Sequence, residues 1–248
     1  ASSMRLNNSG LLEGLNQDVS PGIGLEVRPY GLFTSQASPI TGQPQTRNHF
    51  TGGVDLSYSL TAGLRSVFTV NTDFAQTEVD QRAVNLTGFP LFFPEKRTFF
   101  LEGATFFDFG SVTQVSASSG SGFSRPVDNS IIPFFSRRIG LDANGNPQKI
   151  NYGVKLMGQI GGRRDLGVLY VRTGTDNGVP GEDFLVFRPK QRLFRQSYVA
   201  GLYTLRRQPG SNLQALQTIG ADFQLATSAF RGSRNLSTTG FFLHNTNP

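Results

Sequence analysis

The densest group of charged residues in the sequence is Pro94-Glu95-Lys96-Arg97 with Glu102, and it lies among phenylalanines. Carboxylate and guanidinium groups can hydrogen-bond to the hydroxyls of a polysaccharide while a phenyl ring stacks on a sugar face. The alternative is a buried ion-pair network, in which Glu95 or Glu102 pairs with Arg137 or Arg138 to fix an inward-folded loop. The sequence favours this structural alternative. The candidate ligand-binding residues are Glu95, Arg97, Phe99, Phe100, Glu102, Arg137 and Arg138.

Two other groups of residues suggest chemistry that their context does not support. Asp73, Glu78 and Asp80 are of the type that glycosidases use, but nothing in their spacing sets the required distance between two carboxyl groups. They are interpreted as polar residues that line a lumen or cap a loop. Residues 142–146 begin like a calcium loop, yet Pro147 stands where that loop requires glycine. A tight turn explains this segment.

The remaining composition excludes several classes of site. The sequence has no cysteine and two histidines, His49 and His244, neither of which has a nucleophile or metal ligand nearby in the chain. We therefore expect no catalytic residue, no metal ion and no cofactor, and expect that the protein is not an enzyme. The net charge of +6 would suit a polyanion, but the arginines occur as pairs beside strand-like segments. No nucleic-acid partner is expected.

The composition favours strands over helices. Only 37% of the residues are hydrophobic, while 29 are glycine and 22 are phenylalanine, a mixture typical of many short strands with glycine-containing turns. No run of about eighteen apolar residues is present, so no transmembrane helix is expected. If the chain spans a membrane, it must do so as a closed sheet.

Alternation of apolar and polar residues predicts roughly eight to ten strands. In the clearest strand, residues 150–160, Ile150, Val154 and Leu156 lie on one face while Lys155 and Gln159 lie on the other. The remaining strands are predicted at 25–33, 54–60, 64–71, 166–173, 184–188, 197–206, 219–226 and 239–244. This pattern fits a membrane barrel with a polar lumen, and it fits a soluble β-sandwich equally well. The absence of tryptophan counts against the barrel.

One long segment, residues 73–110, interrupts the alternating pattern. It holds nine phenylalanines, too many to leave in water, and so we expect it to pack inside a barrel as a plug or inward loop. Residues 111–130 follow and include a Ser/Gly-rich stretch, and they are predicted to form a flexible loop.

Several motifs resemble one bacterial family of unknown function. The motifs are NTDFAQTEVD at 71–80, NLTGF at 85–89, FFPEKRTFFLEG at 92–103, FFSRRIG at 134–140 and YGVKLMG at 152–158. The usual residues of that family differ at Thr72, Thr77, Gly88 and Thr98, and these departures leave the match intact. In that family, a domain similar to the family 9 carbohydrate-binding modules precedes a C-terminal membrane barrel.

The resemblance implies an all-β fold, an antiparallel transmembrane β-barrel of which residues 1–248 are a portion. A carbohydrate-binding-like domain is expected before Ala1, and further strands are expected after Pro248. The implied location is the outer membrane of a Gram-negative bacterium, in contact with lipid and lipopolysaccharide. The implied function is non-enzymatic, the binding or admission of a carbohydrate-like ligand such as an oligosaccharide. The alternative is a scaffold barrel that docks an envelope protein, and a barrel-embedded hydrolase that uses Glu95 and Glu102 is the least favoured.

Overall fold

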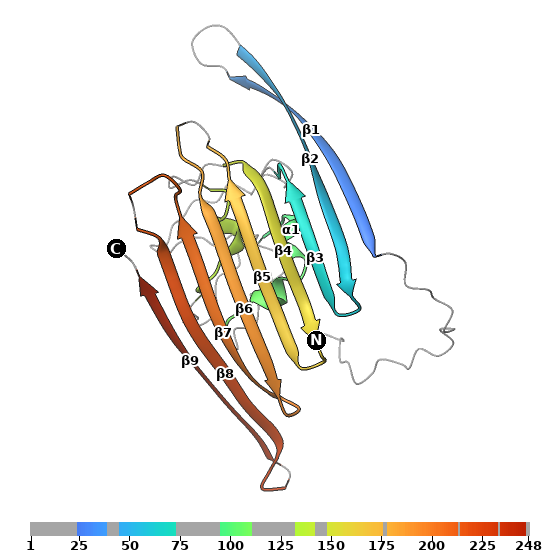
Figure 1. Ribbon diagram of the computed structural model, residues 1–248, viewed down its shortest axis with the longest axis vertical. Coiled ribbons are helices and arrows are strands. Elements are labelled where there is room, and N and C mark those ends of the chain that lie inside the picture. The colour runs from blue at the N-terminus through green and yellow to red at the C-terminus, as the bar shows by residue number, and fades with distance from the viewer. Residues whose placement is uncertain are drawn as a thin grey trace, which may run out of the picture.

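The computed structural model describes residues 24–38, 45–72, 95–110, 132–141, 148–175, 178–212, 214–232 and 234–246. They form one antiparallel sheet in which nine strands are ordered β1 to β9, each paired with its neighbour in the chain (Figure 1). The prediction of an all-β antiparallel fold is therefore confirmed. The strands are β1 (Leu25–Ser38), β2 (Gln45–Thr61), β3 (Leu64–Val70), β4 (Ile150–Ile160), β5 (Arg164–Thr173), β6 (Asp183–Leu193), β7 (Ser197–Arg207), β8 (Leu216–Phe230) and β9 (Arg234–Thr246).

All the predicted strands are present, but five of them are several residues longer than the alternation indicated. β1, β2, β6, β8 and β9 extend by several residues, mostly polar or small, because backbone pairing between neighbours continues where apolar alternation stops. One face assignment was also wrong. Ile150 was predicted to lie on the apolar outer face, yet a register irregularity between Ile150 and Tyr152 turns its side chain into the buried core.

Several predictions fall on residues outside the described part of the chain. They are the first part of the insertion at 73–94 with its three acidic residues, the flexible loop at 111–130 and the turn at 142–147. The described residues of the connection between β3 and β4 are 71–72, 95–110, 132–141 and 148–149. They include the helix α1 (Thr98–Leu101) and two single 3-10 turns, η3 (Ala104–Phe107) and η4 (Ser136–Arg138).

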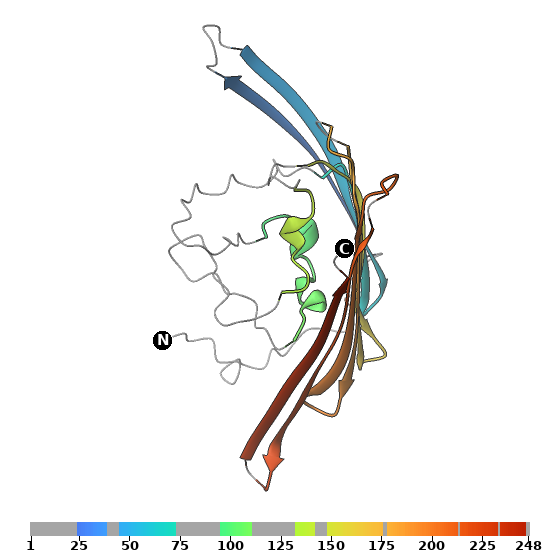
Figure 2. The same cartoon turned by 90° about the vertical axis from the view of Figure 1, so that its left-hand side faces the viewer.

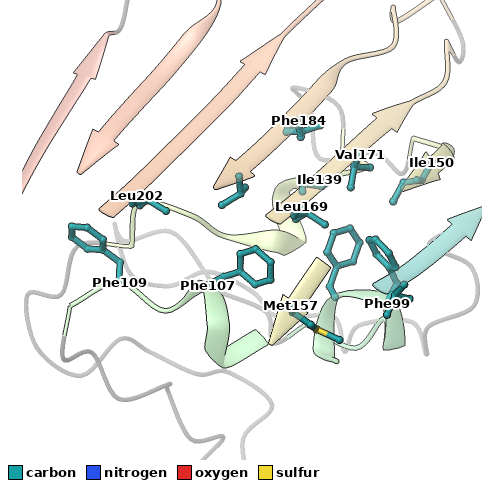
Figure 3. Packing of buried hydrophobic residues seen from close by; sticks show 13 residues of the cluster. Phe99, Phe107, Phe109, Ile139, Ile150, Met157, Leu169, Val171, Phe184 and Leu202 are labelled. Carbon is teal, nitrogen blue, oxygen red and sulfur yellow. The ribbon is translucent and has the colours of Figure 1, made fainter. Parts of the chain in front are cut away.

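The sheet is curved, and the connection between β3 and β4 packs against its concave face (Figure 2). Its described residues 95–110 and 132–141 are called the inward connection, and residues 95–110 are the described part of the predicted insertion. Gly103 links α1 to η3 in the left-handed conformation, with a φ of 65° that glycine adopts without strain. The hydrophobic core lies between this connection and the sheet (Figure 3). Its members are Val67, Phe99, Phe100, Phe107, Phe109, Ile139, Ile150, Met157, Leu169, Val171, Phe184, Val186 and Leu202.

The two faces of the sheet differ in chemistry. Beneath the connection, the concave face carries charged side chains that are buried, among them Lys155, Asp165, Arg188 and Asp222. The convex face is apolar and exposed, as the pleat and the strand registers define it. Its exposed large side chains are Leu25, Val27, Phe33, Phe50, Tyr58, Phe68, Val70, Tyr152, Ile160, Phe187, Val199, Ile219, Phe223, Leu225, Leu236 and Phe242.

The connections at the two ends of the sheet differ in length. At one end of the sheet, the turns that follow β2, β4, β6 and β8 have two or three residues each. At the other end the connections are longer, and the one between β3 and β4 runs from residue 71 to residue 149. No helix in the described part of the chain is long and apolar enough to cross a membrane.

Candidate functional site

The charged cluster at 95–97 ties two distant parts of the inward connection together. The Arg97 guanidinium donates from Nε and Nη2 to the two carboxylate oxygens of Glu95, at 2.8 and 2.7 Å. It also donates to the carbonyl oxygens of Ile139 and Ser136 at 2.7 and 2.9 Å, and it lies 4.0 Å from the centre of the Phe100 ring. The Ser136 hydroxyl completes the network with a bond of 2.8 Å to Glu95. Because Glu95, Arg97 and Ser136 supply one another with hydrogen-bond partners, they form a buried network that we call the clamp.

The clamp predicts a loss of stability in acid. Burial raises the pKa of Glu95, but hydrogen bonds and charge from Arg97 and a hydrogen bond from Ser136 outweigh it, so the pKa lies below the ordinary 4.5. A carboxyl with a lowered folded-state pKa contributes stability that is complete above its unfolded value and is lost as the pH falls through the folded value. We therefore expect Glu95 to stabilise the fold fully at neutral pH, and to lose that contribution below about pH 4.5.

The measurement is the urea midpoint of the folded protein between pH 7 and pH 3, for wild type and Glu95→Gln. Wild type is expected to lose roughly 1–3 kcal/mol more than Glu95→Gln over this range, the size of hydrogen bonds to a charged group. Glu26→Gln is the matched control, because Glu26 also pairs with arginines but is half-exposed. An equal acid loss in wild type and Glu95→Gln would contradict the assignment.

A second anchor fixes α1 to the strands β1, β3 and β4. Glu102 accepts an ion pair of 2.6 Å from Arg65 of β3, and a longer one of 3.5 Å from Arg28 of β1. Lys155 of β4 donates from Nζ to the carbonyl oxygens of Phe99 and Glu102. The lysine is 1% exposed, so these carbonyls replace the water that its ammonium group would otherwise require.

A third anchor holds the end of the described insertion against β6 and β8. Arg188 and Asp222 form a fully buried, two-bond ion pair of 2.5 and 2.9 Å. Arg188 also donates to the carbonyl oxygen of Asp108 at 2.9 Å, while Asp222 accepts from the backbone N–H of Gly110 at 3.0 Å. The pair therefore connects two strands and the insertion in one network.

Glycines on the concave face leave room for the phenylalanines of the insertion. A Cβ atom at Gly153 would lie 2.9 Å from the Phe99 ring, and one at Gly220 would lie 2.9 Å from the Phe109 ring. Both distances are shorter than ordinary carbon contacts, so any larger residue would displace the ring. Charged anchors and ring sockets together hold the insertion against the sheet.

The structure brings most of the predicted site residues together, but chiefly in the core. Arg97, Phe99 and Phe100 are buried, and Arg137 is 7% exposed. The expected pairing of Arg137 or Arg138 with Glu95 or Glu102 was wrong. Glu95 instead pairs with Arg97 in its own segment, and Glu102 pairs with strand arginines that approach it through the fold.

Besides Lys155, which the alternation already placed on the polar face, four strand residues of these anchors were absent from the sequence-based site, namely Arg28, Arg65, Arg188 and Asp222. Each lies at an inward position of its strand according to the pleat and register. The alternation of apolar and polar residues could have identified them as charges on the polar face. Their partners in the insertion lie far away in sequence, and no spacing rule links them.

An open pocket of about 300 Å³ lies beside the clamp. Residues 132–139 form one wall, and strands β6, β7, β8 and β9 form the other. Arg138 lines this pocket and is exposed, whereas its neighbour Arg137, the other predicted site residue of this pair, is buried. Within the described residues, no group of three or more His, Cys, Asp or Glu side chains is placed to hold a metal ion.

Comparison with protein families gives one match. Residues 21–114 are similar to a family described as a domain of unknown function (DUF5916). This region covers β1 to β3, α1 and η3, and thus includes Glu95, Arg97 and Glu102. Neither the curated proteins nor the solved structures gave a match.

Proposed function

We propose that the chain forms part of the wall and the plug of an outer-membrane β-barrel, a non-enzymatic protein that binds or admits a carbohydrate-like ligand. One observation carries the membrane part of the proposal: the exposed face of the sheet is apolar, whereas the covered face carries buried charged side chains beside the core residues. A soluble sheet has the opposite arrangement, with the apolar face packed on a core and the polar face in water. Lipid against the convex face would satisfy this arrangement.

The dimensions of the strands agree with a bilayer. β4 to β7 have 10 or 11 residues, the length that a tilted strand needs to cross a membrane. From Tyr152 to Ile160, the outward side chains of β4 cover roughly 20 Å of membrane depth, assuming ~3.3 Å per residue and a tilt of about 40°. This depth is close to the height of the apolar band of known barrels, which is about 25 Å.

The convex face changes character towards the end with the long connections. The Tyr152 and Tyr170 rings lie 6.0 Å apart there, and Tyr170 donates to Asp183 at 2.9 Å. Asp183 also pairs with Arg172 and Arg207, at 2.9 and 3.1 Å. Tyrosines followed by charged groups are typical of a membrane interface, and here tyrosine takes the role that tryptophan often has.

The lengths of the connections suggest an orientation. Outer-membrane barrels have short turns on the periplasmic side and longer loops on the cell exterior. By this rule the turns that follow β2, β4, β6 and β8 face the periplasm, and the inward connection enters the lumen from outside. The burial of its described phenylalanines favours a plug over the scaffold alternative, in which these rings would be exposed to a partner.

Gel mobility and fractionation of the full-length protein test this proposal. We expect the protein in the outer-membrane fraction, resistant to extraction by salt, and we expect its electrophoretic mobility to change on boiling because a closed barrel resists detergent until heated. A salt-extractable protein with the same mobility before and after boiling would refute the membrane assignment. In that case, a second layer of protein must cover the convex face.

A further inference from the structure

The pocket beside the clamp differs from the anchors in having an arginine available to a ligand. Arg97, Arg188 and Arg206 each pair with a carboxylate, namely Glu95, Asp222 and Glu182. No acidic side chain in the described part of the chain pairs with Arg138, which is exposed where it lines the pocket. A guanidinium group in such a position favours an anionic partner, and its planar donors match a carboxylate in two-bond geometry.

The other walls of the pocket combine aromatic and neutral polar groups. Phe134 and Phe184 contribute rings from the inward connection and from β6, while Thr204 and Asn245 contribute a hydroxyl and an amide. Arg206 is held by two bonds of 2.9 Å to Glu182, and its guanidinium carbon lies 5.7 Å from the Phe184 ring. Its charge is thus largely neutralised, which leaves Arg138 as the main cationic group of the pocket.

Size and position limit the ligand further. A volume of about 300 Å³ is at the lower end of the range for small-molecule sites, which suits one sugar unit or a molecule of similar size. The strand ends that line the pocket, at Phe184, Arg206 and Leu216, are those next to the long connections. In the orientation proposed above, this end faces the cell exterior.

We infer that this pocket binds a small organic carboxylate with an apolar face, and specifically the uronic acid unit of an acidic oligosaccharide. The carboxylate would pair with Arg138, the apolar face of the sugar would stack on Phe134 or Phe184, and its hydroxyls would bond to Thr204 and Asn245. This site rests on the proposed function, because a ligand reaches the polar face of the sheet only if that face lines a lumen. It replaces the buried cluster at 95–102 as the place of contact.

Calorimetric titration of the full chain in detergent micelles tests the inference with three probes: a uronic acid disaccharide, its neutral counterpart and cyclohexanecarboxylate. We expect the uronic acid disaccharide to bind about threefold to fivefold more tightly than the neutral sugar, because a two-bond contact with a guanidinium adds affinity while the exposure of Arg138 to solvent screens it. Arg138→Gln should abolish this preference, and Arg138→Lys should retain part of it. Arg195→Gln, an exposed arginine in the turn between β6 and β7, is the matched control and should bind like wild type.

The other outcomes are equally informative. Equal affinity of Arg138→Gln and wild type for the acidic disaccharide would overturn the inference, as would binding of neither carboxylate. Binding of cyclohexanecarboxylate alone would overturn the sugar assignment.

Asn245→Leu provides a second variant away from the clamp, and it should weaken binding of both sugars. The same preparations are checked for mobility on boiling, so a protein that shifts but binds no carboxylate refutes the pocket alone, whereas loss of the shift refutes the barrel.

Discussion

Phe223→Arg should prevent stable insertion of the protein into the outer membrane, whereas Gln224→Arg should leave insertion intact. The two residues are adjacent on β8 and point to opposite faces of the sheet. Phe223 lies on the apolar convex face, and an arginine there would face lipid at a cost of roughly 2–4 kcal/mol near the bilayer midplane. Gln224 lies on the concave side, where a charge remains in contact with water and polar side chains.

The measurement is the fraction of each variant that shows heat-dependent mobility after refolding into lipid vesicles, together with its urea midpoint. The pair separates the membrane proposal from the soluble alternative. If the convex face is in water, exchanging an exposed phenylalanine for arginine is close to neutral or improves solubility. Equal folding yields of the two variants in vesicles would therefore contradict a lipid-facing convex surface.

Asp222→Ala should be the most destabilising substitution on the concave face, costing about 3–5 kcal/mol. The side chains of Arg188 and Asp222 are both fully buried, so the change leaves a guanidinium group without its counter-charge and without water. It also removes the acceptor for the backbone N–H of Gly110. We expect the insertion to loosen as well, since Arg188 and Asp222 both bond to its backbone.

Two variants make this prediction specific. Arg188→Met combined with Asp222→Leu should recover much of the lost stability, because a buried ion pair replaced by apolar side chains is often neutral. Arg192→Ala removes a pair with Asp165 in which the arginine is half-exposed, and it should cost at most about 1 kcal/mol. The measurements are urea midpoints and the rate of protease cleavage within residues 95–110. A cost below about 1 kcal/mol for Asp222→Ala would remove this pair from the anchors that hold the insertion.

The three anchors join different parts of the chain. The Glu95–Arg97 clamp joins the two described halves of the inward connection to each other, while the Glu102 and Arg188–Asp222 groups join that connection to the strands. Burial of apolar surface has little directional preference by itself, so the charged anchors add fixed directions to the position that the ring sockets at Gly153 and Gly220 define. Charged groups with several fixed partners define one position.

The sequence by itself determined the strands and their faces. A period of two in apolar residues depends only on the pleat, so alternation between Tyr152, Val154 and Leu156 on one side and Lys155 on the other could be recognised without any partner strand. The same local signal identified the insertion, because nine phenylalanines outside any alternating pattern require burial somewhere. Ile150 was misassigned because an irregularity in register leaves no mark in composition.

Only the tertiary structure decided which charges meet. Glu102 is 37 residues from Arg65, and Arg188 is 34 residues from Asp222; each pair meets because curved strands and an inward connection bring them together. The need of buried carboxylates for a counter-charge suggested Arg137 and Arg138 as partners of Glu95 and Glu102, but Arg97 pairs with Glu95 and strand arginines pair with Glu102. The exposure of Arg138 also follows from packing, since its neighbour Arg137 has the same chemistry and is buried. The type of a side chain determines which partners it can bind, and the fold determines which of those partners lie within bonding distance.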